Sequence, residues 1–392
     1  MKKGWEEKTL GEVSVFSQGI QVDVNLQTEI CSPGKVRFLR IIDVTQGNVP
    51  PRYINNPGEK YYLKADEIAM VRYGTVGFVC YGFEGVIANN LFKISIKDKS
   101  KLRSRFLQYF LKSELFQSHI RKGVGGAALP AIKFGDIKHI MVGIPPLTEQ
   151  QAIVDYLDAA FAKIDAMKAN AEKALGEAKA LFQASLKEML EPKEGWEYKK
   201  LGECFISINN GANIKQIKGA KGIPITRIET LSNDKFNRGR MGYADVLDAS
   251  PYSSYILNDG DILMSHINSM KYLGRAVQYL KNGDETIIHG MNLLRLVPTK
   301  DVLSTFLIYQ FFTAFFRNQI VSISHQSVNQ ASFNTTNLKK LKLKVPPLSE
   351  QQTIVTTLDT LKSKVDRLQA NYEQISAECD ALKQAILKQV FE

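Results

Sequence analysis

Amide and cationic side chains gather around glycines in two separate parts of this sequence. The first part contains "VRYGTVGF", "ANNLF" and "RKGVGGAALPAIK", and the second contains "SHINSMKYLGR", "HGMN" and "HQSVNQASF". Amide and guanidinium groups make paired hydrogen bonds to planar polar partners such as nucleobase edges, and Lys, Arg, Ser and Thr bind phosphate oxygens. The candidates for such contacts are Arg72, Tyr73, Thr75, Asn89, Asn90, Arg121, Lys122, Lys133, Arg227, His266, Asn268, Lys271, Arg275, His289, Asn292, Gln326, Ser327, Asn329 and Gln330, with His325 beside them.

Some of these candidates have an equally good structural interpretation. Asn90 and Asn292 occupy the same place in two similar segments, and an asparagine shared in this way is often a turn former. Arg40 and Arg227, in "LRIIDV" and "TRIET", also occupy similar places. These two arginines are either structural ion-pair partners or phosphate contacts.

Residues that could catalyse a reaction do not form a recognisable motif. The "PP" pairs follow Ile144 and Val345 and so lack the Asp or Asn of an amino-methyltransferase motif. The sequence has no GxGxxG fingerprint and no GxxxxGK[ST] phosphate loop, and its five histidines have no metal-ligand spacing. The four cysteines lie far apart, which fits a reducing cytosol better than a disulfide framework or a zinc site. We therefore predict a chain without catalytic, cofactor or metal sites.

Composition points to a packed and basic protein. The chain has 392 residues, 44% of them hydrophobic and 23% charged, and its net charge is +11. Two basic blocks, residues 1–147 and 192–347, alternate with two mildly acidic ones, residues 148–191 and 348–392. Basic blocks attract polyanions such as nucleic acids. The start of the sequence lacks the apolar stretch of a signal peptide, and its longest apolar run is too short to span a bilayer, so we expect a cytoplasmic protein.

The charge pattern follows an internal repeat. "GWEEKTLGE" at Gly4–Glu12 returns as "GWEYKKLGE" at Gly195–Glu203, and "IPPLTEQQAIVDYLD" from Ile144 returns as "VPPLSEQQTIVTTLD" from Val345. The ends of the two copies agree, whereas their middles have diverged. Divergent loops on a shared scaffold favour different recognition by the two copies, with neutral drift as the alternative.

Each copy closes with a long helix. After the prolines, Thr148 and Gln151 in the first copy and Ser349 and Gln352 in the second have the spacing of a capping box. Apolar residues then follow a 4-3 spacing that predicts two coiled-coil helices, paired antiparallel. The predicted seam positions are Ile153, Leu157, Ala160, Ile164, Met167, Ala171, Ala174, Ala178 and Leu181, and then Ile354, Leu358, Leu361, Val365, Leu368, Tyr372, Ile375, Cys379, Leu382 and Ile386.

Together these features resemble the specificity (S) subunit of type I restriction–modification systems. The resemblance rests on tandem basic domains that open with "GW…LGE" and close with "PPL[TS]EQQxIVxxLD" before a long heptad helix, and it covers the whole chain. It implies that each basic block is a target recognition domain for one half of a split DNA sequence. The paired helices would fix the spacing and bind two methylation (M) subunits.

The resemblance also implies which chemistry belongs to other chains. The M subunits would carry S-adenosylmethionine and methylate adenine, a restriction (R) subunit would add the nuclease, and the S subunit would not be a catalyst. Apolar residues beside the predicted seam are candidates either for binding M subunits or for packing against this chain's own domains. These residues are Val154, Phe161, Phe182, Val355 and Phe391.

The expected fold is α+β, with two tandem mixed α/β target recognition domains, two long antiparallel coiled-coil helices and a pseudo-twofold repeat. The expected segments are residues 1–147, 148–191, 192–347 and 348–392. Two other functional classes stay open at this point. One is a stand-alone bipartite DNA-binding regulator, and the other is a coiled-coil scaffold for acidic protein partners.

Overall fold

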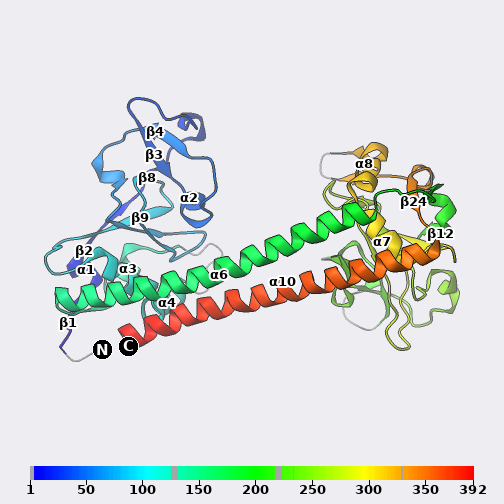
Figure 1. Ribbon diagram of the computed structural model, residues 1–392. Helices are drawn as coiled ribbons and strands as arrows, with labels where there is room; N and C mark the ends of the chain where they lie inside the picture. Colours follow the sequence, from blue (N-terminus) through cyan, green and yellow to red (C-terminus); the bar gives the residue numbers. More distant parts are fainter. Residues whose placement is uncertain (1–3, 125–130, 218–221, 233, 328–329) are drawn as a thin grey trace. The chain divides into compact units, whose positions relative to one another are not determined.

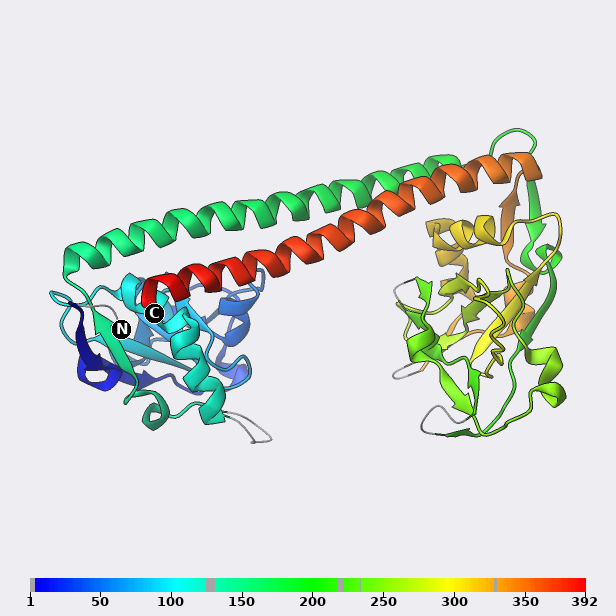
Figure 2. The ribbon, with the colours of Figure 1, turned by 90° about the horizontal axis from the view of Figure 1, so that it is seen from below.

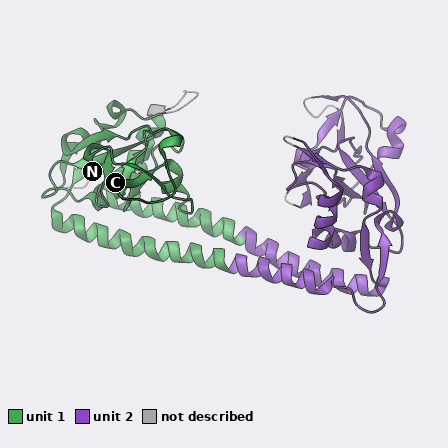
Figure 3. Ribbon diagram, turned by 90° about the horizontal axis from the view of Figure 1, so that it is seen from above, with its two compact units in different colours: residues 1–173, 371–392 green, residues 174–370 purple. Residues whose placement is uncertain are grey.

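The computed structural model describes residues 4–124, 131–217, 222–232, 234–327 and 330–392. The chain forms two compact units, coloured separately in Figure 3. Unit 1 comprises residues 1–173 and 371–392, and unit 2 comprises residues 174–370. Each unit therefore combines a globular part with one segment of each of the two long helices.

The globular part of unit 1 is built on two four-stranded sheets. Their strand orders are β2-β9-β6-β7 and β4-β3-β8-β5, and the β3–β8 pair is parallel while the other pairs are antiparallel. The first sheet and helix α3 share a core that includes Met70, Phe92 and Phe106. The strands are β1 (Glu6–Thr9), β2 (Ser14–Gln18), β3 (Lys35–Leu39), β4 (Arg52–Asn55), β5 (Tyr62–Leu63), β6 (Ile68–Val71), β7 (Val79–Tyr81), β8 (Gly85–Ile87), β9 (Leu91–Ile96) and β10 (Met141–Ile144). The helices are α1 (Leu10–Val13), α2 (Ile41–Thr45), α3 (Ser104–Lys112), α4 (Glu114–Val124) and α5 (Phe134–Ile137).

Unit 2 repeats the first of these sheets with strand order β12-β21-β18-β20. Smaller sheets, β13-β17-β14, β15-β16 and β19-β23-β22, surround it. The strands are β11 (Glu197–Lys200), β12 (Phe205–Asn210), β13 (Gln216–Ile217), β14 (Ile223–Ile225), β15 (Leu231–Ser232), β16 (Lys235–Phe236), β17 (Gly242–Ala244), β18 (Ile262–Ser265), β19 (Ile267–Asn268), β20 (Ala276–Gln278), β21 (Leu293–Pro298), β22 (His325–Gln326), β23 (Ala331–Ser332) and β24 (Lys342–Val345). The helices are α7 (Ser304–Phe312), α8 (Ala314–Ile323) and α9 (Thr335–Lys339).

In both units the repeated "GW…LGE" segment pairs with the strand that leads into the long helix. β1 is antiparallel to β10 and β11 is antiparallel to β24. β10 precedes helix α6 (Leu147–Met189), and β24 precedes helix α10 (Leu348–Phe391). The first and last motifs of each repeat are thus neighbours in space, which explains why they form the common frame of the two copies.

The repeated glutamine of "EQQ" ties each long helix to its own unit. Gln150 is fully buried; its Oε1 accepts from the backbone N–H of Arg103 at 2.8 Å, and its Nε2 donates to the carbonyls of Lys101 and Pro145, both at 2.8 Å. In unit 2, Gln351 makes the matching bonds to Leu303 N (2.9 Å), Asp301 O (3.0 Å) and Pro346 O (2.9 Å).

The predicted capping boxes are wrong. α6 begins at Leu147 and α10 at Leu348, so Thr148 and Ser349 lie inside the first turn and do not cap it. The proline before each helix, Pro146 or Pro347, has the fixed φ that suits a helix start. Fixed proline geometry and the buried glutamine together define the entry into each helix.

The two long helices lie side by side and antiparallel, as predicted (Figures 1 and 2). In unit 1 the thiol of Cys379 lies 3.8 Å from the carbonyl oxygen of Ile164. In unit 2 Lys179 donates to Gln369 at 2.7 Å. Within unit 1, Asp165 pairs with Lys383 and Lys168 pairs with Asp380, so the partner in α10 comes earlier in the chain as the residue in α6 comes later, which is the antiparallel order.

The seam in α6 differs from the prediction at alternate positions. Met167 and Leu181 are 58% and 59% exposed, whereas Leu175 and Phe182 are 6% and 8% exposed. Because α6 is rich in alanine, its apolar residues form two adjacent stripes. The stripe with the bulkier side chains is buried, since it removes more apolar area from water. In α10 the predicted positions from Ile354 to Cys379 are buried or half-buried.

The apolar residues beside the seam pack within their own units. Val154, Phe161 and Phe391 join the core of unit 1, and Phe182 and Val355 join that of unit 2. Of the two alternatives for these side chains, the structure supports packing against the chain's own domains. Over the residues that the structure describes, no helix is long and apolar enough to cross a membrane.

Candidate nucleic-acid interface

A tight turn between β8 and β9 holds two of the predicted contact residues in unit 1. Leu91 N donates to Ala88 O at 2.9 Å, which places Asn89 and Asn90 at the two central positions of a β-turn. The chain after β2 passes directly against this turn, because a Cβ on Gly19 would overlap the carbonyl oxygen of Ala88. Only glycine allows this approach.

Asn89 is the centre of a polar cluster on this turn. Its Nδ2 donates to Gln21 Oε1 at 3.1 Å, and the hydroxyl of Tyr73 donates to its Oδ1 at 3.2 Å. Gln18 Nε2 lies 3.5 Å from the Asn89 carbonyl. Gln21 and Tyr73 are exposed and Asn89 is half-buried, so the cluster is accessible from solvent.

Hydrogen bonds of Arg72 connect the Asn89 turn to the neighbouring chain. Arg72 Nε donates to the Ile132 carbonyl at 3.2 Å, and Arg72 N donates to the Asn90 carbonyl at 2.8 Å. The Oδ1 of Asn90 is buried and has no hydrogen-bond partner among the described residues. The geometry favours the turn-forming interpretation of Asn90. Lys133, next to Ile132, is exposed.

Unit 2 builds the same turn with different side chains. Leu293 N donates to Gly290 O at 3.3 Å, and the central residues are Met291 and Asn292. Here Gly211 approaches the carbonyl of Gly290 as Gly19 approaches that of Ala88. Met291, the counterpart of Asn89, is 46% exposed. The two units therefore present a thioether and an amide at equivalent positions.

Two histidines of unit 2 lie inside the protein. His289 is 1% exposed, and its Nε2 lies 2.8 Å from the carbonyl oxygen of Leu293. Burial, and then the charge of Arg295, lower the pKa of His289 to about 3. Burial also lowers the pKa of His266, which is 9% exposed. The burial of both side chains counts against the prediction that they contact DNA.

The loop after β19 carries cations that remain accessible. Lys271 is exposed, and its Nζ lies 5.3 Å from the centre of the Tyr272 ring. Arg275 lies 4.5 Å from the same ring and 3.4 Å from a carboxylate oxygen of Asp234. Arg317 of α8 fixes the loop by donating hydrogen bonds to the carbonyls of residues 270, 271 and 273. Asn268, at the start of the loop, donates a hydrogen bond from Nδ2 to Ser265 Oγ at 3.3 Å.

A short hairpin of β22 and β23 carries the amide-rich segment. Gln326 and Ser327 are exposed, and Ser327 N donates to Gln330 O at 2.7 Å. Asn329 lies outside the described residues. In unit 1, Thr75 and Lys122 are exposed. Arg121 is paired with Glu114 on the same helix, α4.

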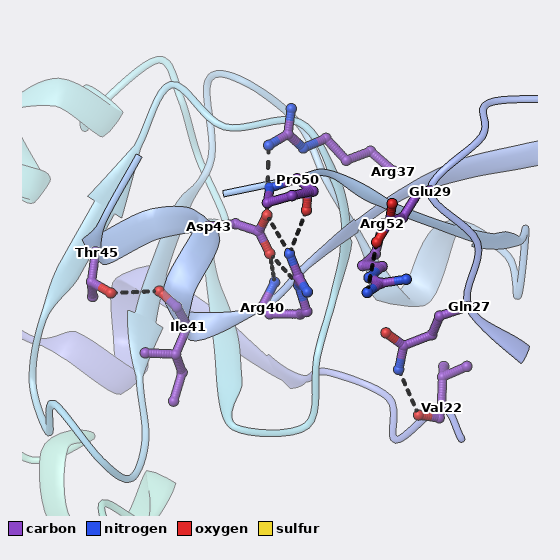
Figure 4. A network of polar contacts seen from close by, with 10 residues as sticks. All are labelled: Val22, Gln27, Glu29, Arg37, Arg40, Ile41, Asp43, Thr45, Pro50 and Arg52. Carbon is purple, nitrogen blue, oxygen red and sulfur yellow. Dashed lines mark hydrogen bonds and ion pairs between the residues drawn. The ribbon is translucent and has the colours of Figure 1, made fainter. Parts of the chain in front are cut away.

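Arg40 has a structural role in unit 1 (Figure 4). Its Nε donates to one oxygen of buried Asp43 at 2.7 Å, and its Nη2 donates to the other oxygen at 3.1 Å and to Pro50 O at 2.8 Å. Arg37 lies 3.7 Å from the same carboxylate. In unit 2, Arg227 donates instead to Gln216. The ion-pair interpretation thus holds for Arg40, and Arg227 also has a partner inside its unit.

Four amides next to the turns were not predicted from the sequence. They are Gln18, Gln21, Asn209 and Asn210. The signal was present, because "SQGIQ" and "INNGAN" place amides around the two glycines that approach the turns. These segments lie near the similar ends of the repeats and not in the divergent middles. In unit 2, Asn209 and Asn210 line a hollow of about 440 Å³ with Ser254, Tyr255 and Arg295.

Comparison with known proteins agrees with this architecture. Putative type I restriction enzyme MjaX specificity subunit of Methanocaldococcus jannaschii is 36% identical over 207 residues, which is 52% of this chain and 48% of that protein. Type I restriction enzyme EcoKI specificity subunit of Escherichia coli K12 is 26% identical over 309 residues, 76% of this chain and 66% of that protein. The matches thus span about half to two thirds of these relatives.

Solved structures show the same fold. A chain from a structure that addresses assembly and conformational transition of the type I R-M system superposes with a TM-score of 0.74 at 18% identity, and covers 100% of this chain and 98% of that one. The HsdS subunit from Thermoanaerobacter tengcongensis gives a TM-score of 0.51, also at 18% identity, with coverage of 100% and 97%.

The family assignment rests on the sequence match to both repeats. The model of the family described as Type I restriction modification DNA specificity domain matches residues 2–175 and again residues 193–377. Each match contains one "GW…LGE" segment, one globular part and the start of one long helix. This confirms the resemblance drawn from the sequence and favours it over the regulator and the scaffold. The chain belongs to the family of type I restriction–modification DNA specificity domains.

Proposed function

We propose that this chain is the sequence-reading subunit of a type I restriction–modification complex, and that each unit reads one half of a split double-stranded DNA target. One observation carries the proposal. The two units place the same glycine-supported turn at the same point of the fold, yet present Asn89 in one and Met291 in the other. A shared frame with different exposed groups suits two recognition modules for two different half-sites.

The charge of the chain supports a polyanionic partner. The net charge is +11, and exposed cations include Lys271 and Lys133, the latter next to Ile132, whose carbonyl accepts a hydrogen bond from Arg72. Contacts from Lys and Arg to phosphates supply affinity and register, whereas amides and apolar groups discriminate bases. The cations are therefore assigned to the backbone of the DNA, and the turn residues to its base edges.

The paired helices are proposed to connect the two half-site readers and to bind the methylation subunits. The apolar residues beside the seam that were first considered for binding methylation subunits pack instead in the cores of their own units. We therefore propose that exposed apolar side chains of α6 and α10 bind the methylation subunits. These are Tyr156, Met167 and Leu181 on α6 and Leu382 on α10, each at least 48% exposed.

The reaction is assigned to the partners. The family supports this assignment, because both repeats match a model described as a DNA specificity domain. In the proposal, methylation subunits bring S-adenosylmethionine and transfer the methyl group to adenine, restriction subunits bring the nuclease, and this chain selects the sequence.

Base-modification sequencing tests the proposal. A host expresses the full chain with its methylation subunit, and a control host expresses the methylation subunit alone. We expect methyladenine in one split motif only when this chain is present. An active methylation subunit that binds this chain but marks no motif would contradict the reading role, and failure of the two chains to copurify would favour a stand-alone regulator.

A further inference from the structure

The turn residue of unit 1 is held in a single orientation. An asparagine amide has two N–H donors and two acceptor lone pairs. In Asn89, one N–H is used by Gln21 at 3.1 Å and one lone pair by the hydroxyl of Tyr73 at 3.2 Å. One donor and one acceptor are left. A phenolic hydroxyl and a glutamine amide can each donate or accept, so in either assignment of oxygen and nitrogen the Asn89 amide keeps one free donor and one free acceptor.

One remaining donor beside one remaining acceptor matches a single base in the major groove. Adenine presents the N7 acceptor and the N6 donor side by side. Guanine presents two acceptors there, cytosine a donor, and thymine an acceptor with a methyl group. A fixed amide therefore favours adenine, and fixing it in advance removes an entropic cost of binding.

The equivalent place in unit 2 lacks this chemistry. Met291 has a thioether, which accepts hydrogen bonds weakly and donates none. Ile267, which follows buried His266 as Tyr73 follows Arg72, has no hydroxyl. The backbone is nevertheless the same, since Phe333 N bonds His266 O as Ile132 N bonds Arg72 O.

We propose that Asn89 is a specificity-determining residue that reads one adenine in the half-site of unit 1, with Gln21 and Tyr73 as its positioning residues. Met291 makes the matching position of unit 2 a reader of apolar groups, such as the methyl of thymine. This inference rests on the proposed function, because it names the base that one reading surface selects.

The sharpest variant is Asn89→Asp, which keeps the size of the side chain and removes both N–H donors. The full chain with its methylation subunit is expressed, and the methylated motif is sequenced. We expect the preference for adenine at one position of one half-site to fall about ten- to a hundredfold. The other half-site should stay unchanged, which shows within the same experiment that the chain is folded and assembled.

Two further variants separate reading from structure. Tyr73→Phe keeps the ring and frees the amide, so it should weaken the same adenine preference by about fivefold without changing which base is preferred. Met291→Leu is the matched control in the other unit, and it should leave the adenine position untouched.

The possible outcomes are distinct. If Asn89→Asp leaves the first half-site unchanged while the motif is still methylated, Asn89 does not read a base and the inference is overturned. If Asn89→Asp weakens methylation of all sequences equally, the residue serves structure, and the inference is again overturned. If the unaltered chain directs no motif, the proposed function fails and the inference fails with it.

Discussion

Gln150 shows how a single side chain connects a helix to a domain. It is fully buried and makes three hydrogen bonds to the backbone of unit 1. We predict that Gln150→Leu lowers the free energy of unfolding by about 2–4 kcal/mol, because it leaves one N–H and two carbonyls without their partners. Urea unfolding measures the loss, and faster amide exchange at Arg103 locates it.

The neighbouring residue offers a matched control. Gln151 is only half-buried, and it bonds Asp155 within the same helix at 2.7 Å. Gln151→Leu should change the free energy of unfolding by less than about 0.5 kcal/mol. Equal effects from the two substitutions would show that the buried hydrogen bonds of Gln150 do not stabilise the unit.

His289 should make stability depend on pH. Its pKa is about 3 in the folded chain against an ordinary value of 6.5. Below about pH 6.5 the unfolded chain binds the proton and the folded chain does not, so stability falls by about 1.4 kcal/mol per pH unit down to the folded pKa. Above this window the contribution of the neutral imidazole is fully present.

Unfolding in urea at pH 7 and pH 5 measures this dependence. The variant His289→Gln lacks the imidazole, so its stability should fall less between the two pH values. NMR provides an independent check, since the imidazole should remain neutral at pH 5. A midpoint near 6.5 for this ring would contradict the burial on which the prediction rests.

At the scale of elements, α6 contains an adjacent pair that tests its packing. Phe182 is 8% exposed and packs in the core of unit 2, whereas Leu181 is 59% exposed. We predict that Phe182→Ala costs about 3–5 kcal/mol of stability, since it opens a cavity. Leu181→Ala should cost less than about 0.5 kcal/mol.

Chemical denaturation of the two variants decides which stripe of α6 faces inward. A larger loss of stability for Leu181→Ala than for Phe182→Ala would show that the seam predicted from the 4-3 spacing, with Leu181 facing inward, is correct. Leu181→Ala has a second use, because Leu181 is one of the exposed residues proposed to bind methylation subunits. A loss of copurification with unchanged stability would assign it to that contact.

At the scale of the whole molecule, the proposed function makes the length of the paired helices a determinant of target geometry. Inserting seven residues into α6 after Lys173 and seven into α10 after Ala370 keeps the heptad spacing in both helices. Seven helical residues add about 10 Å, which equals about three base pairs of DNA. We predict that the gap in the methylated motif grows by about three base pairs while both half-sites stay the same.

An insertion in α10 alone is the control for this experiment. It shifts one helix against the other and exposes part of the seam, so the chain should lose methylation activity and stability. An unchanged gap after the paired insertion would mean that the helices do not set the distance between half-sites.

The structure brings some of the predicted contact residues together and not others, for reasons that differ between residues. Asn89 and Tyr73 were predicted as contact residues because amides and aromatics beside glycines are common in recognition loops, and the structure places them in hydrogen-bond contact. His289 was predicted from its residue type, but type does not reveal that the side chain points into the core. Gln21 was missed because it lies about seventy residues from Asn89 in the sequence and meets it only across the fold.

The sequence by itself determined the family, the two-fold repeat and the two long helices. These features rest on local spacing, namely repeated motifs, proline placement and apolar periodicity. Local spacing of this kind can be seen in the sequence alone. The tertiary structure decided which stripe of α6 is buried, how Gln150 and Gln351 bind, and that Gln21, Tyr73 and Asn89 form one cluster. Those outcomes depend on the competition of side chains for buried area and on hydrogen bonds between distant segments, which no local pattern encodes.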